Sequence, residues 1–154
     1  MKTAQQPTSL AHDRAASAHE YDITNVGPLT LSGRLQSLRY AARGVRLMLR
    51  SQHNAWLHAV ASCCVLILGG LAILSATEWC WIVLAIMAVW TAEALNTALE
   101  LLADVASPEF HPLVEMAKDV AAGGVLIAAC GAAVIGLLVL GPHLPALLRS
   151  VAAL

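Results

Sequence analysis

Three long apolar segments constrain the fold of this chain more than any other feature. They cover about residues 55–76, 79–102 and 120–140, and the third contains no charged residue. Each approaches the roughly 20 residues that a helix needs to cross a bilayer. Because backbone polar groups have no water to bond to in lipid, such segments cross as helices. The sequence therefore predicts an all-α integral membrane protein with three transmembrane helices.

The composition also favours a membrane protein. Of the 154 residues, 58% are hydrophobic and only 12% are charged, whereas a soluble domain carries about 25% charged residues. The four cysteines lie in apolar segments without metal-type spacing, so we assign them no special role. Residues 1–30 lack an apolar run. We therefore expect no signal peptide and a disordered tail there, and nucleic acid is not an expected partner.

Residues 31–52 form an amphipathic pattern before the first span. Such a helix can lie in the membrane interface, with its apolar side in lipid and its arginines toward phosphates. The pattern leaves open whether the arginines contact lipid headgroups or a phosphorylated ligand. The apolar face is Leu35, Leu38, Ala42, Val45 and Leu49, and the neighbouring stripe is Arg39, Arg43, Arg46 and Arg50.

The basic residues also predict the topology. Five arginines between residues 34 and 50 directly precede the first span, and only Lys118 and Arg149 follow it among the basic residues. By the positive-inside rule the segment before that span is cytoplasmic. The turn at 75–78 is then outside, the loop at 104–118 inside and the C-terminus outside. The cytoplasmic position of Lys118 agrees with this rule, whereas the outside position of Arg149 does not. The expected plan is a tail (1–30), a domain at 31–141 (interfacial helix 31–52, spans 54–76, 79–106 and 117–141) and a short tail (142–154).

An acidic face interrupts the second span. At about 100° per residue, Glu93, Asn96, Glu100 and Asp104 fall within roughly one 80° arc of a helix. Ionisable groups are expensive in a membrane and mark a functional site by default. From the residues alone they could form a lipid-kinase or hydrolase site, an ion pathway, or polar contacts between helices. The last interpretation is strongest for Asn96, because intramembrane Asn often only bonds a neighbouring helix.

Several motifs resemble one known family. They are A-E-A-L-N-T-A-L-E at 92–100, Asp104, S-P-E-F-H-P at 107–112 and A-K-D-V-A-A-G at 117–123. In this order and spacing they resemble the prokaryotic diacylglycerol kinase family, which includes undecaprenol kinases, over about residues 31–140. The resemblance implies a homotrimer in the bacterial inner membrane, with an interfacial helix before the three spans of each protomer. It also implies active sites shared between protomers at the cytoplasmic face.

The reaction implied by the resemblance is direct transfer of the ATP γ-phosphoryl group to a membrane lipid alcohol. Diacylglycerol, giving phosphatidic acid, is the first expected acceptor, and undecaprenol is the alternative. No Gly-rich P-loop is present, so an ordinary P-loop site is not expected. A non-catalytic or ion-conducting membrane protein is the alternative of a different class. Few polar groups continue toward the outer face, which disfavours an ion path.

The resemblance also implies roles for individual residues. Glu93 matches the proposed catalytic base, Glu100 a carboxylate that holds Mg²⁺ on the nucleotide phosphates, and Asn96 and Asp104 support the site or the substrate. These roles suit phosphoryl transfer, which needs positioning and charge neutralisation, and Mg²⁺ prefers carboxylates with phosphate oxygens. The positions implied for ATP binding are Tyr40, Arg43, Gly44, Glu109, His111, Lys118 and Asp119.

One position departs from the family pattern. Gln52 stands where the family usually has a second metal-binding Glu, and Trp56 stands where it has Arg, whereas Asn54 and His58 match. Gln52 still offers a carbonyl oxygen but no charge. We therefore expect Gln52 to be a neutral metal ligand beside Glu100. For His53 and His58 we favour a role in helix packing or headgroup contact over one as metal ligands.

Overall fold

The computed structural model describes residues 31–152, and these are helical apart from short connections. Three helices are long and apolar enough to cross a membrane, at His53–Ala72, Ala76–Ala106 and Pro112–Arg149. This confirms the predicted all-α membrane fold. The tail expected at 1–30 lies outside the described residues. The elements are α2 (Leu31–Ser51), α3 (His53–Ala72), α4 (Ala76–Ala106), α5 (Pro112–Leu140), the 3₁₀ helix η2 (Gly141–His143) and α6 (Leu144–Ala152).

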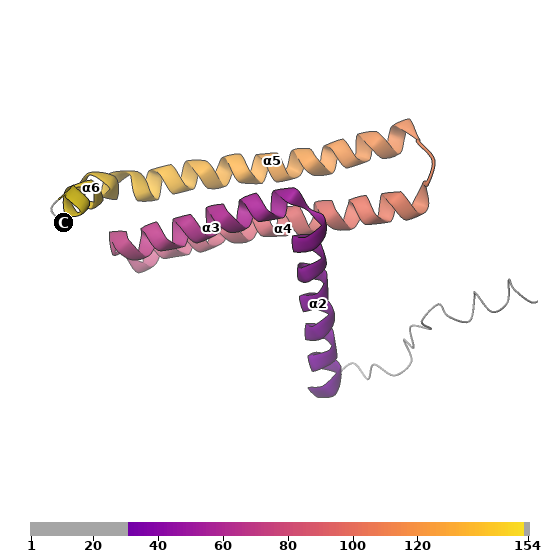
Figure 1. Ribbon diagram of the computed structural model, residues 1–154, viewed down its shortest axis with the longest axis horizontal. Helices are drawn as coiled ribbons and strands as arrows, with labels where there is room; N and C mark the ends of the chain where they lie inside the picture. The colour runs from indigo at the N-terminus through magenta and orange to yellow at the C-terminus, as the bar shows by residue number, and fades with distance from the viewer. Residues whose placement is uncertain (1–30, 153–154) are drawn as a thin grey trace, which may run out of the picture. The chain divides into compact units, whose positions relative to one another are not determined.

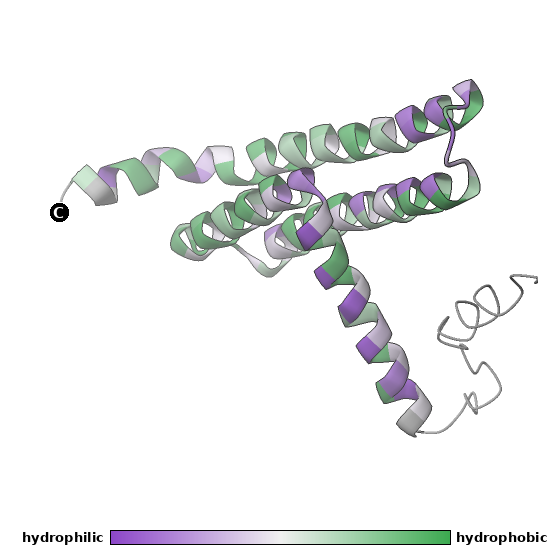
Figure 2. Ribbon diagram, turned by 45° about the vertical axis from the view of Figure 1, so that its right-hand side comes forward, coloured by the Kyte–Doolittle hydropathy of each residue, from purple (hydrophilic) through white to green (hydrophobic). Residues whose placement is uncertain are grey.

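The chain divides into two compact units, one ending at Ala41 and the other beginning at Ala42. The described part of the first unit is the beginning of α2. Hydrophilic and hydrophobic residues alternate along this helix (Figure 2), with Leu35 and Leu38 exposed. Within it, Gln36 Nε2 donates a hydrogen bond to Tyr40 Oη at 3.0 Å.

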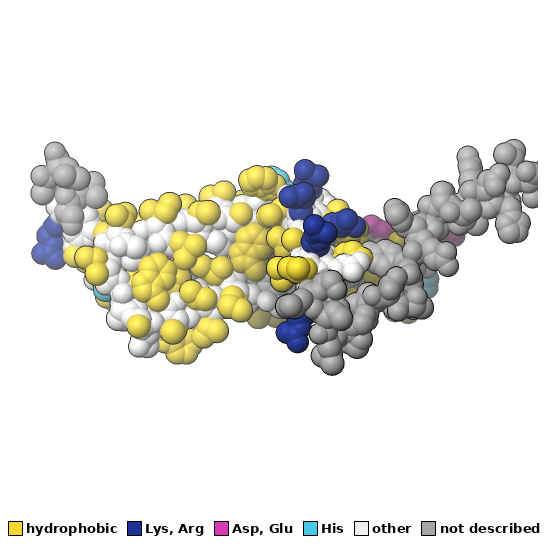
Figure 3. All heavy atoms as spheres, turned by 90° about the horizontal axis from the view of Figure 1, so that it is seen from below, with side chains coloured by type: hydrophobic (Ala, Val, Ile, Leu, Met, Phe, Trp, Pro, Cys, Tyr) yellow, Lys and Arg dark blue, Asp and Glu magenta, His cyan; other side chains and the backbone are white. Residues whose placement is uncertain are grey.

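In the second unit, α3, α4 and α5 lie side by side (Figure 1), and α4 packs most extensively against α5. Their shared core is small. It centres on buried Ile82, Leu74 and Leu140, with partly buried side chains such as Trp79 packed around them. Most large apolar side chains of these helices are exposed instead, and hydrophobic atoms spread over the face seen in Figure 3. An apolar surface of this extent suits lipid or other protomers.

The turn between α3 and α4 is tightly built. Ile73 ends α3 with a left-handed backbone (φ 53°), and Ser75 caps α4. Ser75 N donates to Glu78 Oε2 at 2.8 Å and Glu78 N donates to Ser75 Oγ at 3.4 Å, which is a capping box. This cap starts α4 at Ala76, three residues before the expected position 79.

The far end of α5 is attached to the same turn. His143 Nε2, in η2, lies 2.8 Å from Glu78 Oε1. Residues 142–154 were expected to be a short tail, and the structure forms η2 and α6 over most of them. The contact therefore joins the start of α4 to the end of α5.

The opposite end of the bundle carries the connection from α4 to α5. Hydrophilic residues gather there (Figure 2). The Ser107 hydroxyl donates to the Glu109 carbonyl at 2.9 Å, and His111 Nδ1 accepts from the Leu113 backbone N–H at 3.3 Å. Because His111 is the N-cap and Pro112 occupies the first turn, where its missing N–H costs nothing, α5 begins at 112 and not at 117.

Candidate active site

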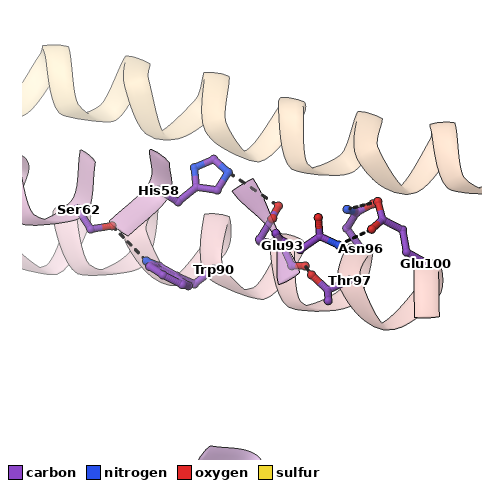
Figure 4. A network of polar contacts seen from close by, with 8 residues as sticks. His58, Ser62, Trp90, Glu93, Asn96, Thr97 and Glu100 are labelled. Carbon is purple, nitrogen blue, oxygen red and sulfur yellow. Dashed lines mark hydrogen bonds and ion pairs between the residues drawn. The ribbon is translucent and has the colours of Figure 1, made fainter. Parts of the chain in front are cut away.

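α4 carries three polar residues on one face in its second half, close to the first turns of α3 (Figure 4). Glu93 is 1% exposed and Asn96 is 5% exposed, and Glu100 is partly buried one turn further on. Burying a carboxylate costs free energy unless it is paired and hydrogen-bonded. The placement of Glu93 therefore calls for an explanation other than packing.

Glu93 has no hydrogen-bond partner on either carboxylate oxygen among the described residues. Its backbone is held, because the Thr97 hydroxyl donates to the Glu93 carbonyl at 2.9 Å. The nearest ionisable side chain is His58 on α3, with Nε2 3.9 Å from Glu93 Oε2. A general base needs a carboxylate oxygen that is free to accept a hydrogen bond from the substrate hydroxyl, and both buried oxygens of Glu93 meet this requirement.

Glu100 is held by two amides. Asn96 Nδ2 donates to Glu100 Oε1 at 3.1 Å, and Gln52 Nε2 donates to Glu100 Oε2. Gln52 lies in the extended break between α2 and α3, with φ −109° and ψ 120°. The fold thus brings together two residues 48 positions apart, which were the two expected metal ligands. Asn96 Oδ1 is buried and has no partner among the described residues.

The side chains present fit a magnesium ion shared with a nucleotide. No group of three or more His, Cys, Asp or Glu residues that could hold a metal occurs within residues 31–152. Mg²⁺ does not need such a group, because it typically takes one or two carboxylates together with substrate phosphates and water. Glu100 offers one carboxylate for such an ion. Gln52 can supply its amide oxygen once its amide group turns over.

Asp104 belongs to a second, exposed part of the site. Lys118 Nζ donates to Asp104 Oδ1 at 3.2 Å across the connection between α4 and α5. The acidic face expected from the sequence therefore divides into a buried part, with Glu93, Asn96 and Glu100, and this exposed ion pair. The pair holds the Lys118 ammonium, in the second turn of α5, beside the end of α4.

The other positions implied for ATP binding lie on α2, in the connection and on α5. Glu109 and Asp119 are exposed, and His111 uses Nδ1 as the cap of α5. Tyr40, Arg43 and Gly44 lie on an exposed part of α2.

Sequence reasoning favoured helix packing or headgroup contact for His58 and did not predict its position beside Glu93. His58 lies beside Glu93, and one turn further along α3 the Ser62 hydroxyl accepts from Trp90 Nε1 at 3.1 Å (Figure 4). The available signal was the spacing. His58 and Ser62 are four residues apart on α3, and Trp90 and Glu93 are three apart on the antiparallel helix, so both pairs form one polar seam.

An apolar cavity of about 530 Å³ lies between α3, α4 and α5. It extends from His58, beside Glu93, to Gly141 and Leu144 at the other end of the bundle. The side chains that line it are almost all aliphatic, including those of Val65, Ile82, Val89 and Leu137. A hydrocarbon chain could lie in this cavity with its polar end near Glu93.

Comparison with known proteins identifies the family. The family model described as prokaryotic diacylglycerol kinase matches residues 39–140. The chain belongs to the prokaryotic diacylglycerol kinase family. It is therefore a lipid kinase, as the sequence predicted, and a bacterial multi-pass membrane protein that uses ATP and a lipid substrate.

Two relatives in this family carry different names. The undecaprenol kinase of Bacillus subtilis is 42% identical over 109 residues, which cover 71% of this chain and 89% of the relative. The diacylglycerol kinase of Synechocystis sp. is 36% identical over 115 residues, 74% of this chain and 66% of the relative. The region that the family model matches, residues 39–140, includes α3, α4, α5 and the residues of the buried site.

Proposed function

We propose that this kinase transfers the γ-phosphoryl group of ATP to the hydroxyl of diacylglycerol, giving phosphatidic acid. Undecaprenol is the second candidate acceptor, because the Bacillus subtilis relative at 42% identity is named undecaprenol kinase. The observation that carries the proposal is the buried Glu93 carboxylate, which has no hydrogen-bond partner among the described residues and lies beside a cavity suited to a lipid chain.

In this proposal Glu93 is the general base. As the lipid oxygen bonds to the γ-phosphorus, its proton moves to the Glu93 carboxylate. The bond from the γ-phosphorus to the bridging oxygen breaks, and its electron pair leaves with ADP. Asn96 supports the acceptor, since its buried Oδ1 can accept a hydrogen bond from a bound ligand. The aliphatic cavity takes a hydrocarbon chain and excludes water.

Glu100 and Gln52 would hold Mg²⁺ on the nucleotide phosphates, where the ion neutralises phosphate charge. Lys118 exchanges part of its contact with Asp104 for the nucleotide, because a compact ammonium suits a phosphate oxygen. The remaining nucleotide contacts are assigned to Tyr40, Arg43, Gly44, Glu109, His111 and Asp119, on the family resemblance.

The assembly and topology are part of the same proposal. The homotrimer is carried over from the family resemblance, and the exposed aliphatic side chains of α3, α4 and α5 offer surface for contacts with other protomers as well as with lipid. A cytoplasmic active site and an outside C-terminus are supported by the arginines before the first span. The hydrophilic end of α4 and α5 would then face the cytoplasm, where ATP is present.

The decisive experiment uses purified protein in mixed micelles with labelled ATP, Mg²⁺ and each lipid alcohol in turn. Labelled phosphatidic acid supports the first acceptor, and labelled undecaprenyl phosphate supports the second. Glu93→Gln should abolish most of the product, whereas the matched control Glu115→Gln, on an exposed part of α5, should not. The proposal fails if the wild-type protein labels neither lipid.

A further inference from the structure

Two unsatisfied polar groups face each other between α3 and α4. His58 Nε2 is buried and has no hydrogen-bond partner among the described residues, and the same holds for both oxygens of Glu93. The imidazole reaches toward the carboxylate from α3 (Figure 4), and Nε2 lies 3.9 Å from Oε2. A hydrogen bond needs about 2.7–3.2 Å. A small side-chain rotation would close the gap.

The other donors around Glu93 are already engaged. Trp90 Nε1 donates to Ser62, Asn96 Nδ2 donates to Glu100, and the Thr97 hydroxyl donates to the Glu93 carbonyl. The α5 residues that line the cavity next to His58 carry no titratable or hydrogen-bonding side chain. They are Ala129, Ala132, Ala133, Gly136, Leu137 and Leu140.

The remaining charged group near the pair is Glu100, one helical turn beyond Asn96. Its oxygens accept from Asn96 and Gln52. His58 Nε2, on α3, is the group beside Glu93 that can donate to it without breaking another hydrogen bond.

We propose that His58 is a positioning residue for the base. Its imidazole carries a hydrogen on Nε2, and this N–H donates a hydrogen bond to Glu93 Oε2, which leaves Oε1 for the lipid hydroxyl. This inference rests on the proposed role of Glu93 as the base. During transfer the hydroxyl proton moves to Oε1, and His58 keeps its own proton. His58 touches neither the lipid oxygen nor the nucleotide, and it acts through the carboxylate, which it holds ionised and oriented.

Two substitutions separate a donor from a packing role. His58→Gln keeps an N–H donor near the position of Nε2, whereas His58→Leu keeps an apolar volume without a donor. We expect His58→Leu to lower kcat by about 10–100-fold, as loss of an orienting partner typically does, with the KM for ATP unchanged. His58→Gln should restore kcat to within about threefold of wild type. His53→Leu, at the exposed first residue of α3, is the control and should leave kcat unchanged.

The pH–rate profile adds a readout that packing alone does not change. A carboxylate without a donor holds its proton more tightly. The acid limb of the profile should therefore move to higher pH in His58→Leu and stay near wild type in His58→Gln. The inference is overturned if His58→Leu keeps the wild-type kcat and profile. It is also overturned if both variants lose the same activity and the same thermal stability, which would indicate packing.

A measurement without turnover distinguishes failure of this inference from failure of the proposed function. In protein labelled with ¹⁵N-histidine, the signals that vanish in His58→Gln identify the His58 ring. We expect them to report hydrogen on Nε2 and to shift in Glu93→Gln, but not in Glu115→Gln. Unchanged His58 signals in Glu93→Gln would overturn the contact. A wild-type protein that phosphorylates no lipid but shows this shift would contradict the kinase proposal alone.

Discussion

Replacing Gln52 by Glu tests the metal site directly. In the structure Gln52 Nε2 donates to Glu100 Oε2, and both side chains are partly buried. The substitution exchanges this hydrogen bond for two facing carboxylates. At about 4 Å and an effective dielectric constant of about 20, two such charges repel by about 4 kcal/mol. Water around partly exposed groups lowers that figure, so we take it as the upper limit.

A magnesium ion between the two carboxylates removes this repulsion and is attracted by the added charge. We take one third of the upper limit of the repulsion, about 1.4 kcal/mol, as the gain in free energy of Mg²⁺ binding. The Mg²⁺ concentration for half-maximal activity then falls about tenfold. The same repulsion should lower the unfolding temperature of Gln52→Glu in the absence of metal. Added Mg²⁺ should raise it again, because the ion binds only the folded site.

Two titrations with MgCl₂ check this prediction, one of lipid phosphorylation and one of thermal unfolding in detergent. Ser51→Glu is the matched control, because it adds the same charge one residue earlier, at an exposed position whose hydroxyl bonds the Leu47 carbonyl. It should leave the Mg²⁺ requirement near wild type. An unchanged requirement in Gln52→Glu, or an equal change in Ser51→Glu, would refute the assignment of Gln52 to the metal.

Four further substitutions have defined outcomes. Glu93→Gln should lower kcat by about 10²–10⁴-fold, the usual contribution of a general base, with ATP affinity unchanged in a direct titration. Glu100→Gln should lower activity steeply and recover part of it at high Mg²⁺, since phosphate oxygens still hold the ion weakly; a loss at every Mg²⁺ concentration would indicate a structural role. Lys118→Met should weaken ATP binding more than lipid binding, measured by separate titrations of the two ligands. Gly69→Ala should lower the free energy of unfolding by about 1–3 kcal/mol, because the added Cβ would lie 3.0 Å from the Trp79 ring, and equal unfolding midpoints in denaturant would contradict this.

The membrane helices could be predicted because apolar length alone determines them. Their ends could not be placed to the residue. The start of α4 depends on a reciprocal cap between Ser75 and Glu78, and the start of α5 depends on His111 acting as its cap before Pro112. Both caps are local hydrogen-bond arrangements that an apolar pattern does not register. A hydropathy pattern therefore gives the interior of a span more reliably than its boundary.

The site could be predicted as far as one helix determines it. Helical spacing places Glu93, Asn96 and Glu100 on one face of α4, and the structure has them there. Partners on α3 depend on the register between the two helices, which the turn at Ile73 and Ser75 sets. The contact of Gln52 with Glu100 was expected only from the family resemblance. His58 also matches the family pattern, but that match implied no role beside Glu93, so helix packing or headgroup contact was favoured for it.

The unsatisfied groups of the buried site also connect stability with function. Glu93 and Asn96 leave three side-chain oxygens buried without partners in the described chain, and each such group lowers the stability of the fold. An apolar substitution there would remove this cost, so packing alone gives no reason to keep them. In the proposed function, a lipid hydroxyl donates one hydrogen bond to these oxygens and so satisfies part of this deficit when it binds. The oxygens that lower the stability of the free protein thus gain a hydrogen bond when the acceptor binds, and this gain favours the orientation that transfer requires.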